Sequence, residues 1–395
     1  MCYRRRRSED GDFARKIRLA DLSLEPDEPQ VESSGSSREQ ISARRNRLMA
    51  VGTLILRADA SEETGLGHVM RCLSVAEVWQ EVGGRCSFVT CCMGAAPLER
   101  LSTAGVAVEF SDAAAGSDSD AAQLVRSARE QGAAWVMVDG YHFGGDYQQA
   151  IKNAGLKLLF VDDYGHAGRY SADLVLSQQL QASEIPFEKR SANTRLLLVP
   201  RYFGLRREFE AWRDFKREVP EVARKILVTM GGSDPDNVSL QVLQALRAVE
   251  VKGLEVTVVL GGSNPHGPSV VQEALAWGDS LRLERNTRRM PELMAWADVG
   301  VSAGGGTCYE LAFLQTPMFL ITIAMNHERT CRVLADQGMA IHGGWFNILD
   351  SAQLTSALRQ LILDRELRGS LAERAHTLLD GKGAHRVVQS MIVGS

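Results

Sequence analysis

Residues 53–79 read TLILRADASEETGLGHVMRCLSVAEVW, and this stretch decides the fold. It opens with a short apolar strand at 53–56 and passes through a polar, glycine-containing loop. It then enters a helix expected from 68 to about 82. A strand followed by a glycine turn and a helix is typical of the first unit of a Rossmann-like sheet. The stretch therefore predicts an α/β protein with its first strand inside a parallel sheet.

The same alternation of apolar strands and helix-length segments continues along the chain. In the first half we expect strands at 87–90, 135–138, 156–161 and 174–176. A second series begins near 225, with strands expected at 226–230, 256–260, 299–302 and 318–321. Apolar strands separated by helices indicate parallel sheets covered on both faces. We therefore expect two Rossmann-like domains whose parallel sheets face each other across a cleft, where ligands of such sheets bind.

Composition changes along the chain suggest four parts. Residues 1–48 are rich in Arg, Glu, Asp and Ser, so we expect a disordered N-terminal arm, with Met49 as a candidate natural start. The first domain is expected at 49–203 and carries the catalytic base. A charged linker follows at 204–222. The second domain is expected at 223–395 and binds the nucleotide, and its last helices, 351–392, are candidates to pack back on the first domain.

Overall composition excludes several classes of function. The chain has 395 residues and a formal net charge of −4, so we expect neither nucleic acid nor an anionic membrane as a partner. No apolar run approaches the roughly 18 residues needed to span a bilayer. The seven cysteines are odd in number and lack CxxC spacing, which predicts reduced thiols in a cytoplasmic protein without a metal.

His68 is the candidate catalytic base of the first motif. It follows Gly65-Leu66-Gly67 at the start of a helix, where free N–H groups and the positive dipole end favour an anion and a neutral imidazole. The alternative is a histidine that only caps the helix. We expect substrate contacts from other residues of this motif, namely Arg57, Asp59, Gly65, Gly67 and Arg71.

Two further strand ends carry polar residues that face the predicted cleft. Tyr141 is expected to touch the substrate, with ring packing as its alternative, and His142 is a second candidate. Asp139 is a turn former or a polar contact. Asp162 and Asp163 are adjacent on a strand end, so their side chains point different ways. A turn with one substrate hydrogen bond is therefore favoured over a metal site.

The second half contains a glycine-rich loop that precedes a helix, which suits a diphosphate. Glu310 lies one turn into that helix, where its carboxylate can accept both ribose hydroxyls; the alternative is a glycine turn with a surface glutamate. The loop lacks a P-loop ending, so NTP hydrolysis is disfavoured. The substrate-binding candidates of this half also include Gly231, Gly232, Ser302, Gly304, Gly305, Gly306 and Thr307.

Asn326 follows the strand expected at 318–321. Its amide can hydrogen-bond a sugar amide, a sugar hydroxyl or the attacking water, and we count it with His68 and Tyr141 as catalytic. It can also cap the helix expected from about 327 to 338. The two roles do not exclude each other.

With these motifs in place, residues 54–343 resemble the UDP-2,4-diacetamido-2,4,6-trideoxy-β-L-altropyranose hydrolases of pseudaminic acid biosynthesis, which share the GT-B architecture of MurG-type glycosyltransferases. The string RADAS at 57–61 with GLGHVMRCLSVA at 65–76 is the most specific match. The motifs VDGYHF, VDDYG, MGGSDPDN, SAGGGTCYELA and NHERT follow in the family's order. The resemblance leaves out residues 1–48.

The resemblance implies an inverting displacement in which water attacks the anomeric carbon and UDP departs. Carried over by motif, His68 is the general base, and Tyr141 and Asn326 match further polar active-site residues. Glu310 holds the ribose, and the loop at 303–307 holds the diphosphate. The family implies no metal or cofactor, and it places the product in nonulosonic acid synthesis for surface or flagellar glycans.

Three alternatives stay open on the sequence. The first is a MurG-type glycosyltransferase that uses the same donor site with another acceptor. The second is a hydrolase for a related sugar of legionaminic acid synthesis. The third is a non-catalytic nucleotide-sugar binding module. The sequence does not determine which acylamino sugar fits, the oligomeric state or the extent of domain closure.

Overall fold

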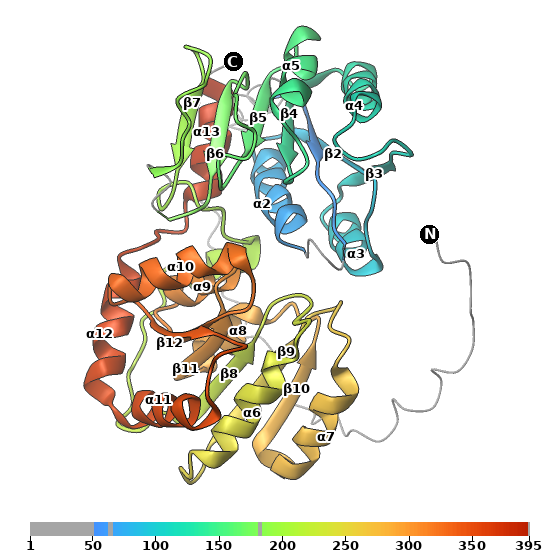
Figure 1. The fold of residues 1–395 in the computed structure, drawn as a ribbon. Coiled ribbons are helices and arrows are strands. Elements are labelled where there is room, and N and C mark those ends of the chain that lie inside the picture. The colour runs from blue at the N-terminus through green and yellow to red at the C-terminus, as the bar shows by residue number, and fades with distance from the viewer. Residues whose placement is uncertain (1–50, 62–65, 181–183, 394–395) are drawn as a thin grey trace, which may run out of the picture. The chain divides into compact units, whose positions relative to one another are not determined.

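The computed structural model describes residues 51–61, 66–180 and 184–393. The predicted arm at 1–48, Met49 and Gly65 lie outside these residues. Figure 1 shows strands and flanking helices in two groups. Within the described ranges, no helix combines the length and apolar character needed to cross a membrane.

The first sheet has seven parallel strands among the described residues, in the order β3-β2-β1-β4-β5-β6-β7. The chain leaves β1 and returns to β4 on its other side, so the connections reverse between these two neighbours. The strands are β1 (Thr53–Arg57), β2 (Arg85–Thr90), β3 (Ala107–Phe110), β4 (Ala133–Asp139), β5 (Leu158–Val161), β6 (Leu174–Ser177) and β7 (Arg195–Leu198).

Helices cover both faces of this sheet (Figure 1). On one face, α2 (Gly67–Glu81) packs over the central strands, and its residues Val69, Leu73 and Val75 are buried in the same cluster as Leu54 and Leu56. The opposite face buries Ile55 and its neighbours against α4 and α5. The connecting helices are α3 (Ala95–Thr103), α4 (Asp118–Glu130) and α5 (Gly145–Asn153).

The second sheet has six parallel strands in the described residues, in the order β10-β9-β8-β11-β12-β13. Its connections reverse between β8 and β11, the same arrangement as in the first sheet. The strands are β8 (Lys225–Thr229), β9 (Glu255–Leu260), β10 (Leu281–Arg285), β11 (Val299–Ala303), β12 (Met318–Thr322) and β13 (Ile341–Trp345). These two sheets confirm the predicted fold class.

The helices of the second half are more numerous than the sequence predicted. The predicted helix at about 237–249 is present as α6, whereas α7, α8 and the strands β10 and β13 were not predicted. The helices are α6 (Val238–Ala248), α7 (Gly267–Trp277), α8 (Met290–Trp296), α9 (Gly306–Phe313), α10 (Met325–Asp336), α11 (Ser351–Leu363), α12 (Arg365–His376) and α13 (Gly383–Val393).

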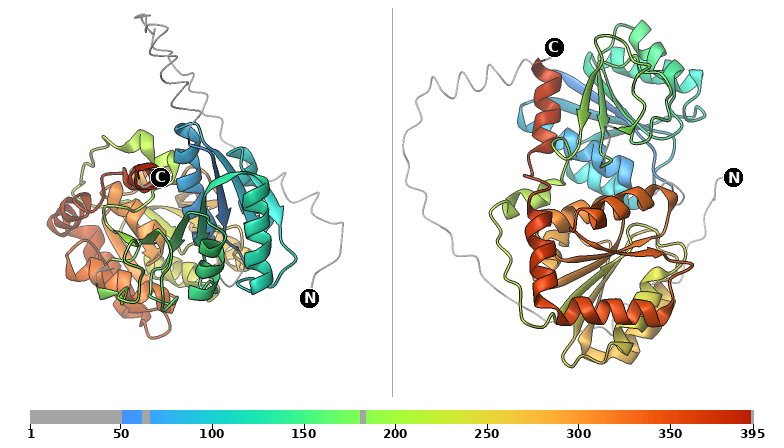
Figure 2. Two further views of the ribbon diagram at one scale, coloured as in Figure 1. Left: turned by 90° about the horizontal axis from the view of Figure 1, so that it is seen from above. Right: turned by 60° about the vertical axis from the view of Figure 1, so that its left-hand side comes forward.

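The last helix, α13, belongs to the core of the first sheet. Its residues Val387, Val388 and Met391 are buried in the cluster formed by α2 and the first sheet, and α13 contacts α2 directly. Figure 2 shows α13, in dark red, beside the blue elements of that sheet. The predicted domain limits at 203 and 223 stay predictions, because segment 204–222 shares a buried cluster with the second half through Leu205 and Phe209.

The start of α13 leaves no room for a side chain. A Cβ added to Gly383 would overlap the backbone carbonyl of Phe203. We expect Gly383→Ala to lower the free energy of unfolding by about 1–3 kcal/mol, the usual cost of forcing atoms into a packed site. Chemical denaturation followed by circular dichroism measures this change.

Gly369→Ala is the matched control, since Gly369 lies in α12 with no heavy atom within 4 Å of an added Cβ. Alanine is the better helix former, so this variant is expected to gain up to about 1 kcal/mol. Equal stability of the two variants would contradict the close packing at Gly383.

Candidate functional site

The first group of candidate residues lies at the carboxyl ends of three strands. β1 leads through residues 58–66 into α2, β4 ends at Asp139, and β5 leads into Asp162 and Asp163. Because β1, β4 and β5 are neighbours in the sheet, their ends meet at one edge. This topology brings His68 at the start of α2 to the residues after β4.

His68 is paired with a buried carboxylate. Its Nδ1 lies 2.7 Å from Oδ1 of Asp139, whose side chain is 1% exposed. Burial alone would raise the pKa of Asp139, but Arg71 and His68 hold this pKa well below its usual range. Asp139 is therefore ionised and acts only as an acceptor, so Nδ1 of His68 donates to it, which is the tautomer whose lone pair lies on Nε2.

Arg71 holds the carboxylate of Asp139 in place. It donates from Nε to Oδ2 over 2.6 Å and from Nη2 to Oδ1 over 2.7 Å. Its third nitrogen, Nη1, donates to Oδ2 of Asp163 over 2.6 Å. Arg71 follows His68 by three positions on α2, so both side chains project from the same face of the helix. Its predicted contact with substrate stays a prediction, since two carboxylates engage it here.

The three predicted catalytic side chains are close to one another. The rings of His68 and Tyr141 pack edge to face with centroids 4.7 Å apart. Tyr141 lies 5.8 Å from the ring of Tyr164, whose hydroxyl donates to the backbone oxygen of Asn326 over 3.3 Å. Burial and the nearby Asp163 raise the pKa of Tyr141, and a side-chain hydrogen bond with Asn326 opposes this rise.

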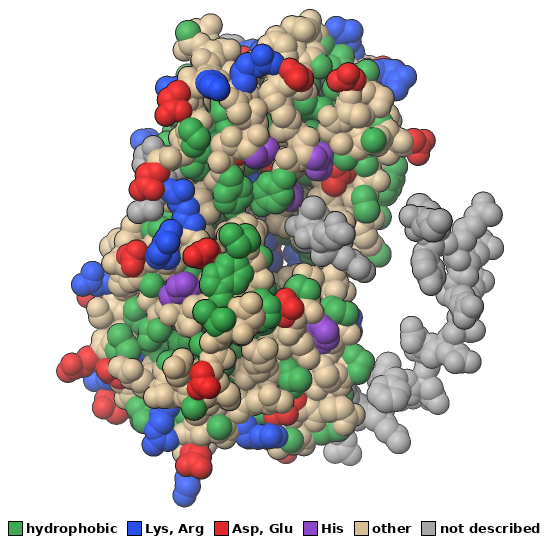
Figure 3. Space-filling view, in the orientation of Figure 1, with side chains coloured by type: hydrophobic (Ala, Val, Ile, Leu, Met, Phe, Trp, Pro, Cys, Tyr) green, Lys and Arg blue, Asp and Glu red, His purple; other side chains and the backbone are tan. Residues whose placement is uncertain are grey.

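The His68 ring is more enclosed than a position at the mouth of a cleft implies. The residue is only 6% exposed, whereas Tyr141 is 44% exposed and Tyr164 is 38% exposed. Figure 3 shows hydrophobic and histidine side chains gathered near the middle of the visible face. The exposed aromatic rings offer an apolar surface beside the imidazole, which suits the methyl groups of an acylated sugar.

Asn326 lies in the first turn of α10 and does not cap it. The helix begins at Met325, two residues earlier than predicted, and its N-cap residue is Ala324, which makes no side-chain cap bond. The capping role considered from the sequence is therefore wrong. The amide remains near Tyr141, in the part of the predicted site that the second half contributes.

Arg57 and Asp59 form a buried ion pair at the end of β1. Arg57 has a fully buried side chain, and its Nη1 lies 2.7 Å from Oδ1 of Asp59. Arg57 also donates to both oxygens of Asp120 over 3.0 Å. Oδ1 of Asp59 accepts the backbone N–H of Cys91 over 2.7 Å, and its Oδ2 lies 3.1 Å from Nε2 of His142. Their role in the structure is to hold strand ends together, and direct substrate contact stays a prediction.

The glycine-rich loop of the second half joins β11 to α9. Gly305 is the N-cap residue of α9, in an extended conformation, and the helix starts at Gly306. A Cβ at Gly304 would overlap Sγ of Cys331, so this position requires glycine. The first N–H groups of α9 have no partners within the helix, which makes this end suitable for an anion. Thr307 lies in the first turn, and Ser302 is buried at the end of β11.

A second glycine pair lies at the end of β8, next to β11 in the sheet. Gly231 has a φ of +87°, a conformation that favours glycine. A Cβ on Gly232 would lie 3.8 Å from Leu66, which stands two residues before His68. Leu66 therefore lies close to Gly232, and the next residue, Gly67, is exposed.

Glu310 pairs with an arginine that the sequence did not single out. Arg206 donates from Nε to Oε1 of Glu310 over 2.6 Å and from Nη2 to Oε2 over 2.8 Å. The two side chains are 15% and 10% exposed. Glu310 is thus not a surface glutamate, which was the alternative considered from the sequence. Its contact with ribose stays a prediction.

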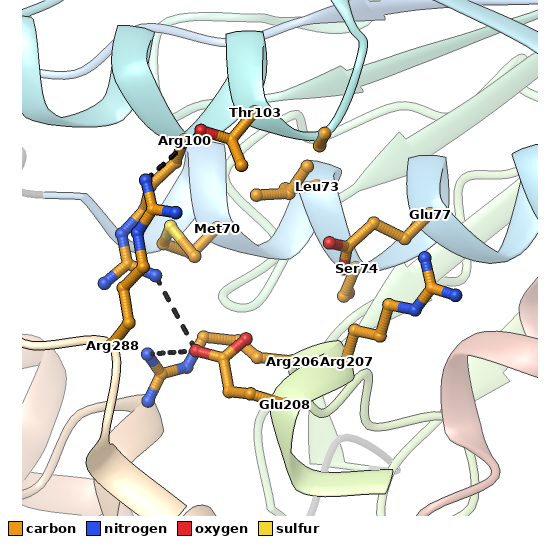
Figure 4. Close-up of a pocket in the computed structure, with 11 residues that line it drawn as sticks. Met70, Leu73, Ser74, Glu77, Arg100, Thr103, Arg206, Arg207, Glu208 and Arg288 are labelled. Carbon is orange, nitrogen blue, oxygen red and sulfur yellow. Dashed lines mark hydrogen bonds and ion pairs between the residues drawn. The ribbon is translucent and has the colours of Figure 1, made fainter. Parts of the chain in front are cut away.

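A charged cavity of about 240 Å³ adjoins this pair (Figure 4). Arg206 and Arg100 both lie near Glu208, at 3.0 Å and 3.6 Å. Arg288 donates to Thr103 over 3.2 Å. On the α2 side of the cavity, burial and the nearby Glu208 raise the pKa of Glu77 to about 7.

One group of described side chains could share a metal ion. The ligand atoms of Glu81, Glu210 and His385 lie within 4.8 Å of one another. Nε2 of His385 lies 3.4 Å from Glu81 and 3.9 Å from Glu210. Glu81 ends α2, roughly 20 Å along the helix from His68. We interpret the group as polar contacts among α2, the 3₁₀ helix at Arg207–Trp212 and α13, remote from the candidate site.

Comparisons with known proteins agree with the motifs. The chain is 22% identical over 295 residues to the UDP-2,4-diacetamido-2,4,6-trideoxy-β-L-altropyranose hydrolase of Campylobacter jejuni, covering 73% of this chain and 98% of that protein. The resemblance seen in the motifs is confirmed. The chain is also 30% identical over 196 residues to the spore coat polysaccharide biosynthesis protein SpsG of Bacillus subtilis, covering 49% of this chain and 57% of the relative.

An uncharacterized protein of Methanocaldococcus jannaschii is 24% identical over 271 residues. These cover 67% of this chain and 54% of the relative, so the chain spans little more than half the length of two of its relatives. No family model matches the chain.

Solved structures confirm the GT-B fold. MurG of Acinetobacter baumannii superposes with a TM-score of 0.62 at 15% identity, covering 87% of this chain and 99% of that structure. The spinosyn rhamnosyltransferase SpnG gives a TM-score of 0.60 at 16% identity, covering 85% and 99%. At these identities the likeness shows the fold alone.

The raised pKa of Glu77 predicts that the free energy of unfolding depends on pH. The folded-state pKa of about 7 exceeds the usual value near 4.3, so ionisation destabilises the fold increasingly from about pH 4 to 7. We expect Glu77→Gln to gain stability relative to wild type as pH rises through this window and to level off above it. Denaturant unfolding at pH 5, 6, 7 and 8 measures the difference, with Glu130→Gln on the exposed end of α4 as control. A difference independent of pH would contradict the raised pKa.

Proposed function

We propose that the protein hydrolyses the anomeric C–O bond of a UDP-diacetamido-trideoxy sugar. The sugar proposed from the relative's name is 2,4-diacetamido-2,4,6-trideoxy-β-L-altrose, and the products are UDP and the free sugar with inverted configuration. The supporting observation is the pairing of His68 with the ionised Asp139 at 2.7 Å. The similarity over 98% of the Campylobacter jejuni hydrolase supports the substrate class. The cytoplasm remains the proposed location.

His68 acts as the general base in this mechanism. Its Nε2 removes a proton from water while the water oxygen attacks C1 of the sugar. The C1–O bond breaks, and its electron pair leaves with the terminal phosphate of UDP. The resulting imidazolium keeps its Nδ1–H bond to Asp139, whose negative charge stabilises the new positive charge.

The leaving diphosphate binds the glycine loop at the start of α9. Its negative charge meets the free N–H groups of Gly306 and Thr307 and the positive end of the helix dipole. Gly231 and Gly232 allow the backbone to approach the same group from β8. Glu310, one turn further along α9, accepts the ribose hydroxyls.

Tyr141 and Asn326 bind the sugar beside the base. The ring of Tyr141 covers one edge of His68, and the Asn326 amide supplies both a donor and an acceptor for an acetamido group. These contacts would hold C1 in line with the attacking water. Positioning of this kind supplies a large part of the rate enhancement of many enzymes.

The decisive experiment incubates purified protein with a panel of UDP-diacetamido sugars and with UDP-N-acetylglucosamine. NMR follows UDP release and the configuration of the first-formed sugar. We expect hydrolysis of a diacetamido-trideoxy substrate, with ¹⁸O from labelled water at the C1 hydroxyl. Label on UDP would show attack at phosphorus. Binding without turnover would favour a binding module, and turnover only after addition of a sugar or lipid acceptor would favour a transferase.

The His68–Asp139 pair is tested by substitution. We expect His68→Asn to lower kcat by about 10²–10⁴-fold, the usual contribution of general base catalysis, with little change in UDP affinity. Asp139→Asn should lower kcat on the same order, because an amide N–H facing Nδ1 moves the ring proton to Nε2. Both constants come from steady-state kinetics and UDP titration calorimetry.

His376→Asn is the control, since His376 ends α12 at the protein surface. It should leave kcat unchanged. Full activity of either site variant would remove this pair from the mechanism.

A further inference from the structure

Arg206 lies in the segment that the sequence assigned only to linking two domains. It stands immediately before a 3₁₀ helix at Arg207–Trp212 and reaches Glu310 on α9. The two bonds of this pair, at 2.6 Å and 2.8 Å, use two neighbouring nitrogens of the guanidinium and both oxygens of the carboxylate. Such a paired geometry fixes the plane of the carboxylate as well as its position.

The pairing with Arg206 uses about half of the hydrogen-bond acceptor sites of the Glu310 carboxylate. An ionised carboxylate has about four lone-pair sites, and Arg206 uses one on each oxygen of Glu310. One site on each oxygen remains, which matches the two adjacent hydroxyls of a ribose. The pair is therefore compatible with the ribose contact and sets the direction from which the hydroxyls must approach.

Neighbouring residues of segment 204–222 also contact the Arg206 side chain. Its Nη1 lies 3.0 Å from Oε1 of Glu208, and its guanidinium lies 5.2 Å from the ring centroid of Phe209. Phe209 is fully buried in the cluster that includes Tyr309 and Phe313 of α9. The side chain therefore has little freedom, and Figure 4 shows it at the edge of the charged cavity.

Arg217, in the same segment, has a purely structural role and serves as a comparison for Arg206. Arg217 donates to the backbone oxygens of Leu314 and Met294, over 3.1 Å and 2.7 Å, and to the hydroxyl of Thr316. Its bonds end on groups that belong to the packed interior. The two shortest bonds of Arg206 instead end on the one carboxylate that the proposed function places at the ribose.

We propose that Arg206 is a positioning residue for nucleoside recognition, which holds the Glu310 carboxylate so that its free lone pairs accept the 2′- and 3′-hydroxyls of ribose. This inference rests on the proposed function, since it needs a ribonucleotide at α9. It makes segment 204–222 part of the nucleotide site.

The test compares UDP with 2′-deoxy-UDP by titration calorimetry. Wild-type protein should bind UDP about tenfold more tightly or better, since one hydrogen bond to a charged group is lost with the 2′-hydroxyl. Arg206→Gln should reduce this ratio to about threefold or less, because Glu310 is no longer oriented. Arg206→Lys keeps the charge but lacks the planar guanidinium. The ratio of the dissociation constants for 2′-deoxy-UDP and UDP should therefore fall in this variant too.

Arg207→Gln is the matched control. Arg207 is exposed and lies 3.5 Å from Glu81, away from Glu310, so this variant should keep the wild-type ratio. Circular dichroism and thermal unfolding check that each variant is folded. With the UDP-sugar as substrate, Arg206→Gln should raise KM more than it lowers kcat, as expected for lost binding.

The outcomes separate this inference from the function on which it rests. If UDP does not bind the wild type, the proposed function fails and the inference with it. If the wild type prefers UDP and both Arg206 variants keep that preference, only the positioning role is overturned. Equal weakening of UDP and 2′-deoxy-UDP in the variants would likewise reduce Arg206 to a structural residue.

Discussion

The carboxylate of Asp139 connects the sheet to the chemistry of the candidate site. It is almost completely buried, and an unpaired charge in that place would cost several kcal/mol. Arg71 supplies the opposite charge, and His68 makes a third hydrogen bond with the same carboxylate. This arrangement exists only because the end of β4 lies beside the start of α2. Any shift in the order or register of β1, β4 and β5 would separate the imidazole from its carboxylate.

Both halves of the protein contain the same kind of paired arginine–carboxylate interaction. In each, an arginine donates two bonds to one poorly exposed carboxylate, Arg71 to Asp139 and Arg206 to Glu310. The paired bonds fix the plane of the carboxylate, so that a second group meets it from one direction. In the proposed reaction this second group is the catalytic imidazole in one half and the ribose in the other.

Local signals in the sequence were sufficient for the fold class and for several of its strands and helices. Long apolar strands such as 226–230 and glycine turns at helix starts depend only on neighbours in the chain, so β8, α2 and α9 were predicted. Strand β10, with the alternating sequence LRLER, carries charges and was missed. The start of α10 was placed too late because its cap, Ala324, has no side-chain signal.

Partners distant in the sequence were not predictable in the same way. Asp139 looked like a turn residue, since its pairing with His68 depends on strand order. Arg206 lay among many charges in 204–222, and nothing local separated it from Arg207. The raised pKa of Glu77 depends on burial in a cavity lined by four separate segments of the chain. Charge, burial and contact across the fold decide these roles, and the sequence shows only the first of them.

The return of α13 to the first sheet also has a consequence for biosynthesis. Helices α2 and α13 complete one apolar layer, although about 300 residues of chain separate them. During translation the early sheet therefore emerges with part of its α2 side uncovered, while the later sheet can assemble with most of its own partners already present. The first half of the chain to be synthesised is thus the last to be completed, and removal of α13 would expose the apolar layer beside α2.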